Sequence, residues 1–279
     1  MFTYEGNLLY PLIFLSFLLG INFNFDRLIT KPVVQFFDSI SRVFYHINSL
    51  VIELIGFGII PLAANLVLQL RINPERILFK QLALILGIDS VIIIFGVFPL
   101  ILYFFGGRQN PYKWIYAALS SAIAGFVSRD SFFTLSILTK HGRESYGIPR
   151  KVGSAVFPLL SMIGKAGTAM VASVGFLLII KSYSSLGITW FQFFWVLLFT
   201  FLTSFLLGSA PATGSLVAIS FLCKFYGRGI EEGYLILNGI MLILISFGVL
   251  IDVISHSAIA LLVTKHENLH QEIETNNFI

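Results

Sequence analysis

The chain has 279 residues, of which 57% are hydrophobic and 11% are charged, and its formal net charge is +4 at pH 7. A soluble domain carries about 25% charged residues, so this composition excludes an ordinary soluble protein and predicts a polytopic membrane protein. The single cysteine, Cys223, excludes a disulfide framework and a cysteine-based metal site. The basic residues lie mostly between apolar segments, so membrane topology explains the positive charge and no nucleic-acid partner is expected.

Three apolar segments in the first part of the chain predict membrane-spanning helices. They run from Asn7 to Phe23, from about Val33 to Leu70 and from about Ile77 to Phe105. A helix needs about 20 apolar residues, with a range of about 17–25, to cross the hydrocarbon core of a bilayer. Each segment is therefore long enough to span the membrane, so the lipid bilayer is an expected partner.

The next segment, residues 112–140, is apolar at both ends and polar in its middle. The middle contains Ser128, Arg129, Asp130 and Ser131. Each arm has about 14 residues, or roughly 21 Å as a helix, which is too short to cross a core of about 30 Å. Two short arms with a polar tip predict a re-entrant helical hairpin.

Residues 150–181 are apolar and long enough to span the membrane, but Gly164, Gly167 and Thr168 surround a single cation, Lys165. Glycine weakens a helix by roughly 1 kcal/mol relative to alanine, so two close together favour a break. Broken backbone at membrane depth must be satisfied by protein or a water-filled cavity, and a buried ammonium needs a partner or a function. We interpret this broken helix as the midplane site of a transporter.

The same pattern then repeats. Residues 190–227 are apolar at both ends, and the middle consists of small residues with Pro211, which predicts a second re-entrant hairpin. The last spanning segment, residues 231–264, carries Gly248, Asp252 and His256. Paired interrupted segments in corresponding places indicate a transporter site between inverted repeats. We therefore expect an all-α polytopic membrane protein, with an inverted-repeat transport core of two re-entrant hairpins and two interrupted transmembrane helices.

The distribution of lysine and arginine predicts the orientation. With the C-terminus in the cytoplasm, more of these residues fall on the inner side than on the outer side, as the positive-inside rule requires. We expect a multi-pass protein of the plasma (inner) membrane with a cytoplasmic C-terminus. Residues 267–279 form a polar tail.

Three motifs resemble those of the dicarboxylate/amino acid:cation symporters, the glutamate transporter family. Residues 124–136, AGFVSRDSFFTLS, are similar to the family's first hairpin tip. Residues 157–170, FPLLSMIGKAGTAM, are similar to its seventh helix, where the family has Asn-Met-Asp-Gly-Thr. Residues 204–215, SFLLGSAPATGS, are similar to its second hairpin tip, in which Pro211 and Gly214 match. The resemblance covers nearly the whole chain and implies that the family's first three helices are missing from this sequence.

This resemblance implies a fold division and a function. Residues 1–105 correspond to scaffold-type helices and residues 106–266 to the transport core. The expected function is secondary transport of a small organic anion, a dicarboxylate or an acidic amino acid, by alternating access. The resemblance also implies a homotrimer and no cofactor apart from the coupling ion.

The sequence departs from the family at the cation site. In the pentapeptide only Gly167 and Thr168 match. Gly164 stands where asparagine ligates sodium, Lys165 where methionine does, and Ala166 where aspartate does. These departures make sodium coupling doubtful and leave the coupling ion open between a proton and sodium.

The last helix departs as well. Registered on its end at residues 265–267, the family's substrate-binding aspartate and arginine become Ile245 and Gly248, and its sodium-binding aspartate becomes His256. A slipped register would place Asp252 on a family aspartate instead. No register supplies the arginine, because no arginine follows Arg228.

The charged residues support coupling without sodium. The Lys165 ammonium could replace a bound cation, and a buried lysine can also carry a proton. Asp252 and His256 are four residues apart on one helical face and could form a proton relay. The alternatives are that Lys165 snorkels or pairs with Asp252, and that Asp252 and His256 are a polar pair that only joins helices. We expect no metal site, because no further histidine or cysteine lies at ligand spacing.

The first tip suits an anion. A guanidinium beside a helix N-terminus forms a good anion site, so Arg129 is the candidate for a substrate carboxylate. The alternative is an ion pair of Arg129 with Asp130 or Asp252.

The second tip would be the gate, or else a small-residue packing contact. The predicted substrate-binding residues are Arg129, Asp130, Ser131, Thr134, Thr168, Ser209, Ala210, Pro211, Gly214 and Asp252. The predicted coupling residues are Gly164, Lys165, Gly167, Asp252 and His256.

Two other functions remain to be weighed against transport. The missing helices and ligands would also fit a non-transporting or channel-like truncated relative of the same family. An intramembrane enzyme would need a nucleophile motif, and the sequence has none, so we expect no enzymatic activity.

Overall fold

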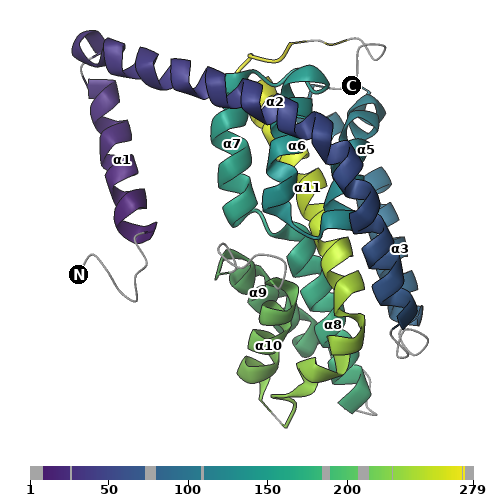
Figure 1. The fold of residues 1–279 in the computed structure, drawn as a ribbon. Coiled ribbons are helices and arrows are strands. Elements are labelled where there is room, and N and C mark those ends of the chain that lie inside the picture. Colours follow the sequence, from purple (N-terminus) through teal and green to yellow (C-terminus); the bar gives the residue numbers. More distant parts are fainter. Residues whose placement is uncertain are drawn as a thin grey trace. The chain divides into compact units, whose positions relative to one another are not determined.

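A computed structural model of the chain describes residues 9–25, 27–72, 80–107, 110–183, 189–206, 214–227, 229–271 and 273. Within these ranges every regular element is a helix, which confirms the predicted all-α class (Figure 1). The chain divides into two compact units, Met1–Glu53 and Leu54–Ile279, and each is described by itself.

The first unit contains two apolar helices at the predicted places. Helix α1 is Leu9–Phe25, and the first part of α2, Arg27–Ile72, belongs to this unit. The side chains of Phe14 and Phe17 on α1 are exposed, as expected for a helix that faces lipid.

The second unit begins with the remainder of α2 and continues with α3, Lys80–Ile92, the π-helical turn η2, Ile93–Val97, and α4, Phe98–Phe105. Proline lacks an N–H, so Pro99 cannot donate the helical bond to the carbonyl four residues earlier. The Phe98 N–H donates to the Ile93 carbonyl, five residues back, which is the π-helical pattern. Helix α3, η2 and α4 form one continuous apolar run over residues 80–105 of the predicted third segment.

The first predicted hairpin consists of α5, Pro111–Ser128, and α6, Ser131–Glu144, which pack against each other. Its tip is Arg129 and Asp130. Arg129 has a left-handed backbone, with φ of 61°, and so ends α5. The Asp130 carboxylate begins α6 by accepting a 2.9 Å hydrogen bond from the Phe132 N–H. The hairpin shape is confirmed, whereas its re-entry into the membrane stays a prediction.

The predicted broken helix is present. Helix α7, Arg150–Ile163, and helix α8, Ala166–Tyr183, are separated by Gly164 and Lys165 alone. The break therefore falls at the two residues where the sequence places a glycine and the buried cation. The second predicted hairpin is represented by α9, Trp190–Leu206, and α10, Gly214–Tyr226, while its tip, residues 207–213, lies outside the described residues.

The last spanning segment corrects one prediction. It begins as the 3-10 helix η3, Gly233–Ile240, and then continues as α11, Met241–His266, without an interruption. The prediction of a second interrupted helix is therefore wrong for residues 241–266. A lone glycine costs a helix only about 1 kcal/mol, and packing of α11 against α5, α7 and α8 offsets that cost at Gly248.

Helix α11 is the central element of the second unit, where it packs against α5, α7 and α8 (Figure 1). Glycines on α8 and α5 allow these helices to approach α11 closely. A Cβ at Gly167 of α8 would overlap the Gly248 carbonyl oxygen and lie 2.6 Å from the Ile251 Cβ. A Cβ at Gly125 of α5 would lie 2.9 Å from a Val253 methyl. Small residues at helix contacts let backbones approach closely, as is typical of membrane helices.

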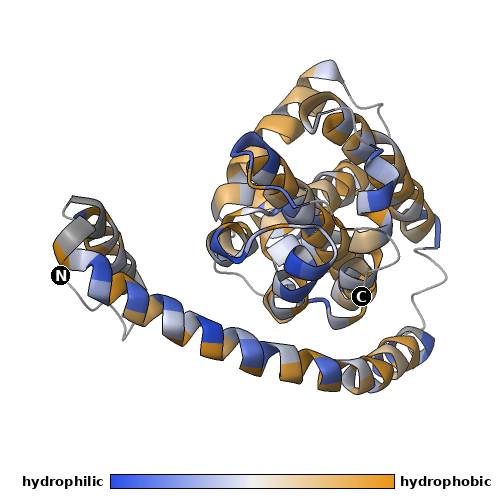
Figure 2. Cartoon of the chain, turned by 90° about the horizontal axis from the view of Figure 1, so that it is seen from above, coloured by the Kyte–Doolittle hydropathy of each residue, from blue (hydrophilic) through white to orange (hydrophobic). Residues whose placement is uncertain are grey.

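The outer surface of the second unit is apolar. Phe57 of α2, Phe105 of α4 and Trp190 of α9 are 77%, 78% and 79% exposed, and many other exposed side chains are hydrophobic. Hydrophobic residues recur along the helices (Figure 2). Among the described residues, four helical segments are long and apolar enough to cross a membrane: Ile29–Gln69, Lys80–Phe105, Arg150–Tyr183 and Gly233–His266. The chain is therefore an integral membrane protein.

The contact between α8 and α11 predicts the effect of a single methyl group. Gly167→Ala should lower the thermal unfolding midpoint by roughly 3–10 °C, because overpacking a close contact costs about 1–3 kcal/mol. Circular dichroism of the detergent-solubilised protein measures this. The control is Gly87→Ala in α3, where the nearest atom would be the Phe247 Cζ at 3.9 Å. A Gly167→Ala protein that melts at or above the control would contradict the packing.

Candidate functional site

The candidate site is the break between α7 and α8. The Gly164 N–H still bonds to the Leu160 carbonyl at 2.6 Å, which ends α7. The Lys165 carbonyl accepts from the Ala169 N–H at 2.9 Å, so α8 begins immediately after Lys165. The first N–H groups of a helix have no partner within the helix, and a buried break must find one elsewhere.

Asp252 of α11 supplies that partner. Its carboxylate is fully buried, and Oδ1 accepts hydrogen bonds from the backbone N–H groups of Gly167 at 2.7 Å and Thr168 at 3.3 Å. Oδ2 accepts from the Thr168 hydroxyl at 2.7 Å. Asp252 thus acts as the N-terminal cap of α8 from another helix, and its negative charge meets the positive end of the helix dipole.

Lys165 lies beside this cap and points to the first hairpin. The side chain is 5% exposed, and its Nζ donates a 3.0 Å hydrogen bond to the Ser131 hydroxyl at the start of α6. The ammonium also lies 5.7 Å from the centre of the Phe132 ring, a cation–π distance. Within the described chain, Lys165 and Asp252 form no direct ion pair. The ammonium of Lys165 is therefore held by Ser131 rather than by a direct ion pair with Asp252, and the snorkelling alternative stays a prediction.

His256 contacts the other side of the break. Its Nε2 lies 2.7 Å from the Gly164 carbonyl oxygen. A carbonyl only accepts, so Nε2 carries the proton. The Nδ1 atom is buried and has no hydrogen-bond partner among the described residues. Asp252 and His256 bind different groups at the break, the start of α8 and the Gly164 carbonyl, and no hydrogen bond joins them among the described residues. The proton relay stays a prediction.

Arg129 at the first tip lies apart from this network. Its Nη1 donates a 3.3 Å hydrogen bond to the Oε1 of Gln69 on α2. Within the described residues it forms no ion pair with Asp130 or Asp252. Thr134 is fully buried, and its hydroxyl donates to the Ser131 carbonyl at 2.9 Å. The tip thus separates into a buried side, which meets Lys165, and a partly exposed side, which meets α2.

The structure therefore brings together many of the predicted site residues and leaves others apart. Hydrogen bonds join the first tip, the helix break and α11 through Ser131–Lys165, Thr168–Asp252 and Gly164–His256. Gly214 is buried at the first position of α10. The predicted residues Ser209, Ala210 and Pro211 lie outside the described residues. Over the described chain, no group of three or more His, Cys, Asp or Glu residues could hold a metal ion.

Sequence reasoning missed three contacts of this site. They are the hydrogen bond between Gln69 and Arg129, the Phe132 ring beside Lys165 and the hydrogen bond of His256 to the Gly164 carbonyl. Gln69 and Phe132 had weak signals: Gln69 is a polar residue near the end of an apolar segment, and Phe132 follows the tip serine directly. Backbone carbonyls leave no signal in a sequence.

Several known transporters are similar to this chain. Excitatory amino acid transporter 5 of Homo sapiens is 26% identical over 176 residues, which cover 62% of this chain and 31% of that protein. The Proton/glutamate-aspartate symporter of Bacillus subtilis (strain 168) is 24% identical over 268 residues, which cover 96% of this chain and 63% of that protein. Neutral amino acid transporter B(0) of Oryctolagus cuniculus is 25% identical over 147 residues. The chain thus spans less than two thirds of the length of the first two relatives.

The sequence model of the sodium:dicarboxylate symporter family matches residues 2–266, which is nearly the whole chain. This match confirms the resemblance drawn from the two hairpin tips and the broken helix. The family description and the names of these relatives are those of membrane transporters. The chain belongs to the sodium:dicarboxylate symporter family.

Proposed function

We propose that the chain is a secondary transporter that moves a dicarboxylate or an acidic amino acid by alternating access. The names of two relatives, an excitatory amino acid transporter and a proton/glutamate-aspartate symporter, support this substrate class. Family membership favours transport over the alternative of a non-transporting or channel-like relative.

The observation that carries the proposal is the buried ammonium of Lys165 in the gap between α7 and α8, hydrogen-bonded to Ser131 of the first hairpin. A charge at this depth is costly unless it is used. Here it joins a hairpin tip to a broken helix, the two kinds of element that form transporter sites between inverted repeats. A change of charge at this position would release the tip from the break.

We further propose that Lys165 replaces a bound cation. The ammonium donates to Ser131 on one side, and the Asp252 carboxylate occupies the N-terminus of α8 on the other. An additional cation would meet a fixed positive charge at short range, which opposes its entry. Proton coupling suits this arrangement better than sodium coupling. The proposed proton carrier is Lys165 itself, because a lysine that releases its proton no longer presents a fixed positive charge, and Asp252 and His256 are the neighbouring coupling residues.

Arg129 is the proposed contact for the substrate carboxylate. Its guanidinium is held by a neutral amide, Gln69, at 3.3 Å, and a carboxylate forms a stronger, charge-assisted pair with arginine. A substrate anion would therefore displace Gln69. The proposed site also includes Asp130, Ser131, Thr134, Thr168 and Asp252, with Ser209, Ala210, Pro211 and Gly214 at the gate.

The remaining organisation is proposed from the family resemblance. Residues 1–105 form the scaffold and residues 106–266 move as the transport core. The Arg129–Gln69 bond then joins scaffold to core and must break during each cycle. The scaffold helices form a homotrimer. The protein lies in the plasma (inner) membrane, with its C-terminus in the cytoplasm.

Counterflow in proteoliposomes tests the proposed substrate class. Vesicles loaded with unlabelled aspartate should accumulate labelled aspartate, glutamate or succinate, because exchange needs no ion gradient. Labelled alanine, which lacks a second carboxylate, should enter at the rate of protein-free vesicles. Sealed vesicles that accumulate none of the three anions would contradict the proposal.

Substitution of Arg129 tests its contact with the substrate. Arg129→Gln should reduce counterflow of the preferred anion by about 10-fold or more, because a hydrogen bond to a charged group contributes about 1.5–3 kcal/mol. Arg129→Lys should retain part of the activity, since it keeps the charge but loses the planar fork. Arg71→Gln, an exposed arginine at the end of α2, is the control.

A second variant separates substrate binding from locking of the hairpin. Gln69→Leu removes the partner of Arg129 and leaves the guanidinium in place. If Arg129 binds substrate, Gln69→Leu should transport at least as fast as the unmodified protein. Loss of transport in Gln69→Leu equal to that in Arg129→Gln would show that Arg129 acts by holding the hairpin to α2.

A further inference from the structure

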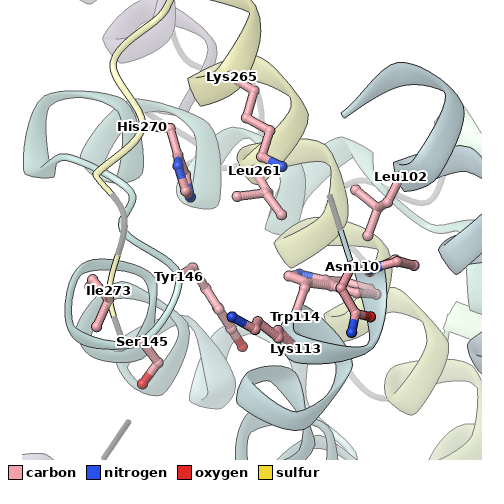
Figure 3. Close-up of a pocket in the computed structure, with 11 residues that line it drawn as sticks. Leu102, Asn110, Lys113, Trp114, Ser145, Tyr146, Leu261, Lys265, His270 and Ile273 are labelled. Atoms are coloured by element: carbon pink, nitrogen blue, oxygen red, sulfur yellow. The ribbon is translucent and has the colours of Figure 1, made fainter. Parts of the chain in front are cut away.

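A cavity lies away from the helix break. It has a volume of about 300 Å³ and is lined by the end of α4, the start of α5, the turn after α6, the end of α11 and the residues that follow α11 (Figure 3). None of the described residues that line it belongs to the hydrogen-bonded network around Lys165. The proposed transport mechanism therefore gives this cavity no role.

The cavity is basic. Lys113 of α5 and Lys265 of α11 reach it from different sides, and the imidazole of His270 completes the basic set (Figure 3). No acidic side chain occurs among the described residues that line it. Lys265 Nζ donates a 2.7 Å hydrogen bond to the Gly106 carbonyl, which fixes the position of that ammonium. Two ammonium groups at one cavity favour an anion.

Trp114 adds an unused donor at the same place. Its side chain is 6% exposed, and its Nε1 is buried with no hydrogen-bond partner among the described residues. An indole N–H only donates, and buried donors normally have a partner. Figure 3 shows the ring along the cavity wall, between Lys113 and Leu102. An oxygen-rich anion in the cavity would supply the missing acceptor.

Trp114 also lines a smaller, wholly apolar cavity of about 70 Å³. That cavity extends along α5 and α11 and is lined by aliphatic and aromatic side chains such as Ile94, Phe95, Ile115 and Leu250. Trp114 is therefore a lining residue of both the basic cavity and the apolar cavity. This combination fits a ligand with an anionic head and a hydrocarbon chain, and it fits a small soluble anion less well.

The position of the basic cavity agrees with such a ligand. Leu102 and Lys265, which lie near the ends of the apolar spans Lys80–Phe105 and Gly233–His266, line the cavity. The ends of spanning helices lie at the polar surface of a bilayer, where lipid phosphates are found and where tryptophan and tyrosine are enriched. Tyr146, in the turn after α6, lines the same cavity.

We propose that this basic cavity binds the phosphate of an anionic phospholipid. Lys113 and Lys265 pair with the phosphate oxygens, the Trp114 N–H donates to one of them, and the hydrocarbon part of the lipid lies against the apolar side chains next to Trp114. The site is separate from substrate transport and does not depend on the proposed function.

Quenching of tryptophan fluorescence by brominated lipid tests this site in the purified full chain in detergent. Brominated phosphatidylglycerol, which is anionic, is titrated against brominated phosphatidylcholine, which is zwitterionic. The chain has three tryptophans, so Trp114→Phe identifies the part of the signal that belongs to the cavity. The saturable quenching by phosphatidylglycerol should disappear in Trp114→Phe.

Charge variants then test the phosphate contact. Lys113→Gln should raise the half-saturating lipid concentration roughly fivefold, as expected for one lysine near a lipid surface. Lys113 is exposed and its substitution leaves the bond of Lys265 to Gly106 in place. The double variant with Lys265→Gln should bind more weakly still. Lys224→Gln on α10, an exposed lysine outside the cavity, should bind as the unmodified chain does.

Three results would overturn the proposal. Equal quenching by the two lipids would show that the headgroup charge is not recognised. An unchanged half-saturation in Lys113→Gln, with an unchanged thermal midpoint, would remove the basic cavity from binding. Displacement of the brominated lipid by millimolar inorganic phosphate would show that the cavity is a site for soluble anions.

Discussion

The arrangement of the second unit depends on the carboxylate of Asp252 at the N-terminus of α8. A helix that stops and restarts inside a membrane leaves backbone N–H groups without partners, and each would be costly in an apolar surrounding. Asp252 accepts from two of these groups and from the Thr168 hydroxyl. The contact is possible because Gly167 has no side chain, and a Cβ there would overlap the Gly248 carbonyl oxygen of α11. The break, its cap and the glycine contact are therefore one structural unit.

The charge of Asp252 also explains how Lys165 is tolerated in the break. The ammonium donates to Ser131 and the carboxylate accepts from the start of α8, so two opposite charges meet at one break without a direct ion pair among the described residues. Lys165 is then left to bind Ser131, which places the first hairpin under the control of a single charge. His256 also holds the break, through the hydrogen bond between its Nε2 and the Gly164 carbonyl oxygen. A proton added to or removed from this group of three residues changes a hydrogen bond to the break or to the tip.

Much of this could be predicted from the sequence. Glycines beside a lone lysine in an apolar segment located the break, and a polar pair between two short apolar arms located the first hairpin. The second interruption was predicted by analogy with the first and does not occur in residues 241–266, because the helices packed against α11 support it through Gly248. The partners of Arg129 and His256 lie 60 and 92 residues away, and hydrogen bonds over such separations depend on the packing of whole helices.

The central claim is that Lys165 takes the place of a bound cation, and gradient-driven uptake measures this most directly. Proteoliposomes would receive either a sodium gradient or a proton gradient, and initial uptake of labelled anion would be compared for the unmodified chain, Lys165→Met and Lys181→Met. Lys181 is an exposed lysine on the same helix and serves as the control. If Lys165 replaces a bound cation, uptake should be driven by protons, insensitive to sodium and lost in Lys165→Met alone. Sodium-driven uptake that survives in Lys165→Met would contradict it.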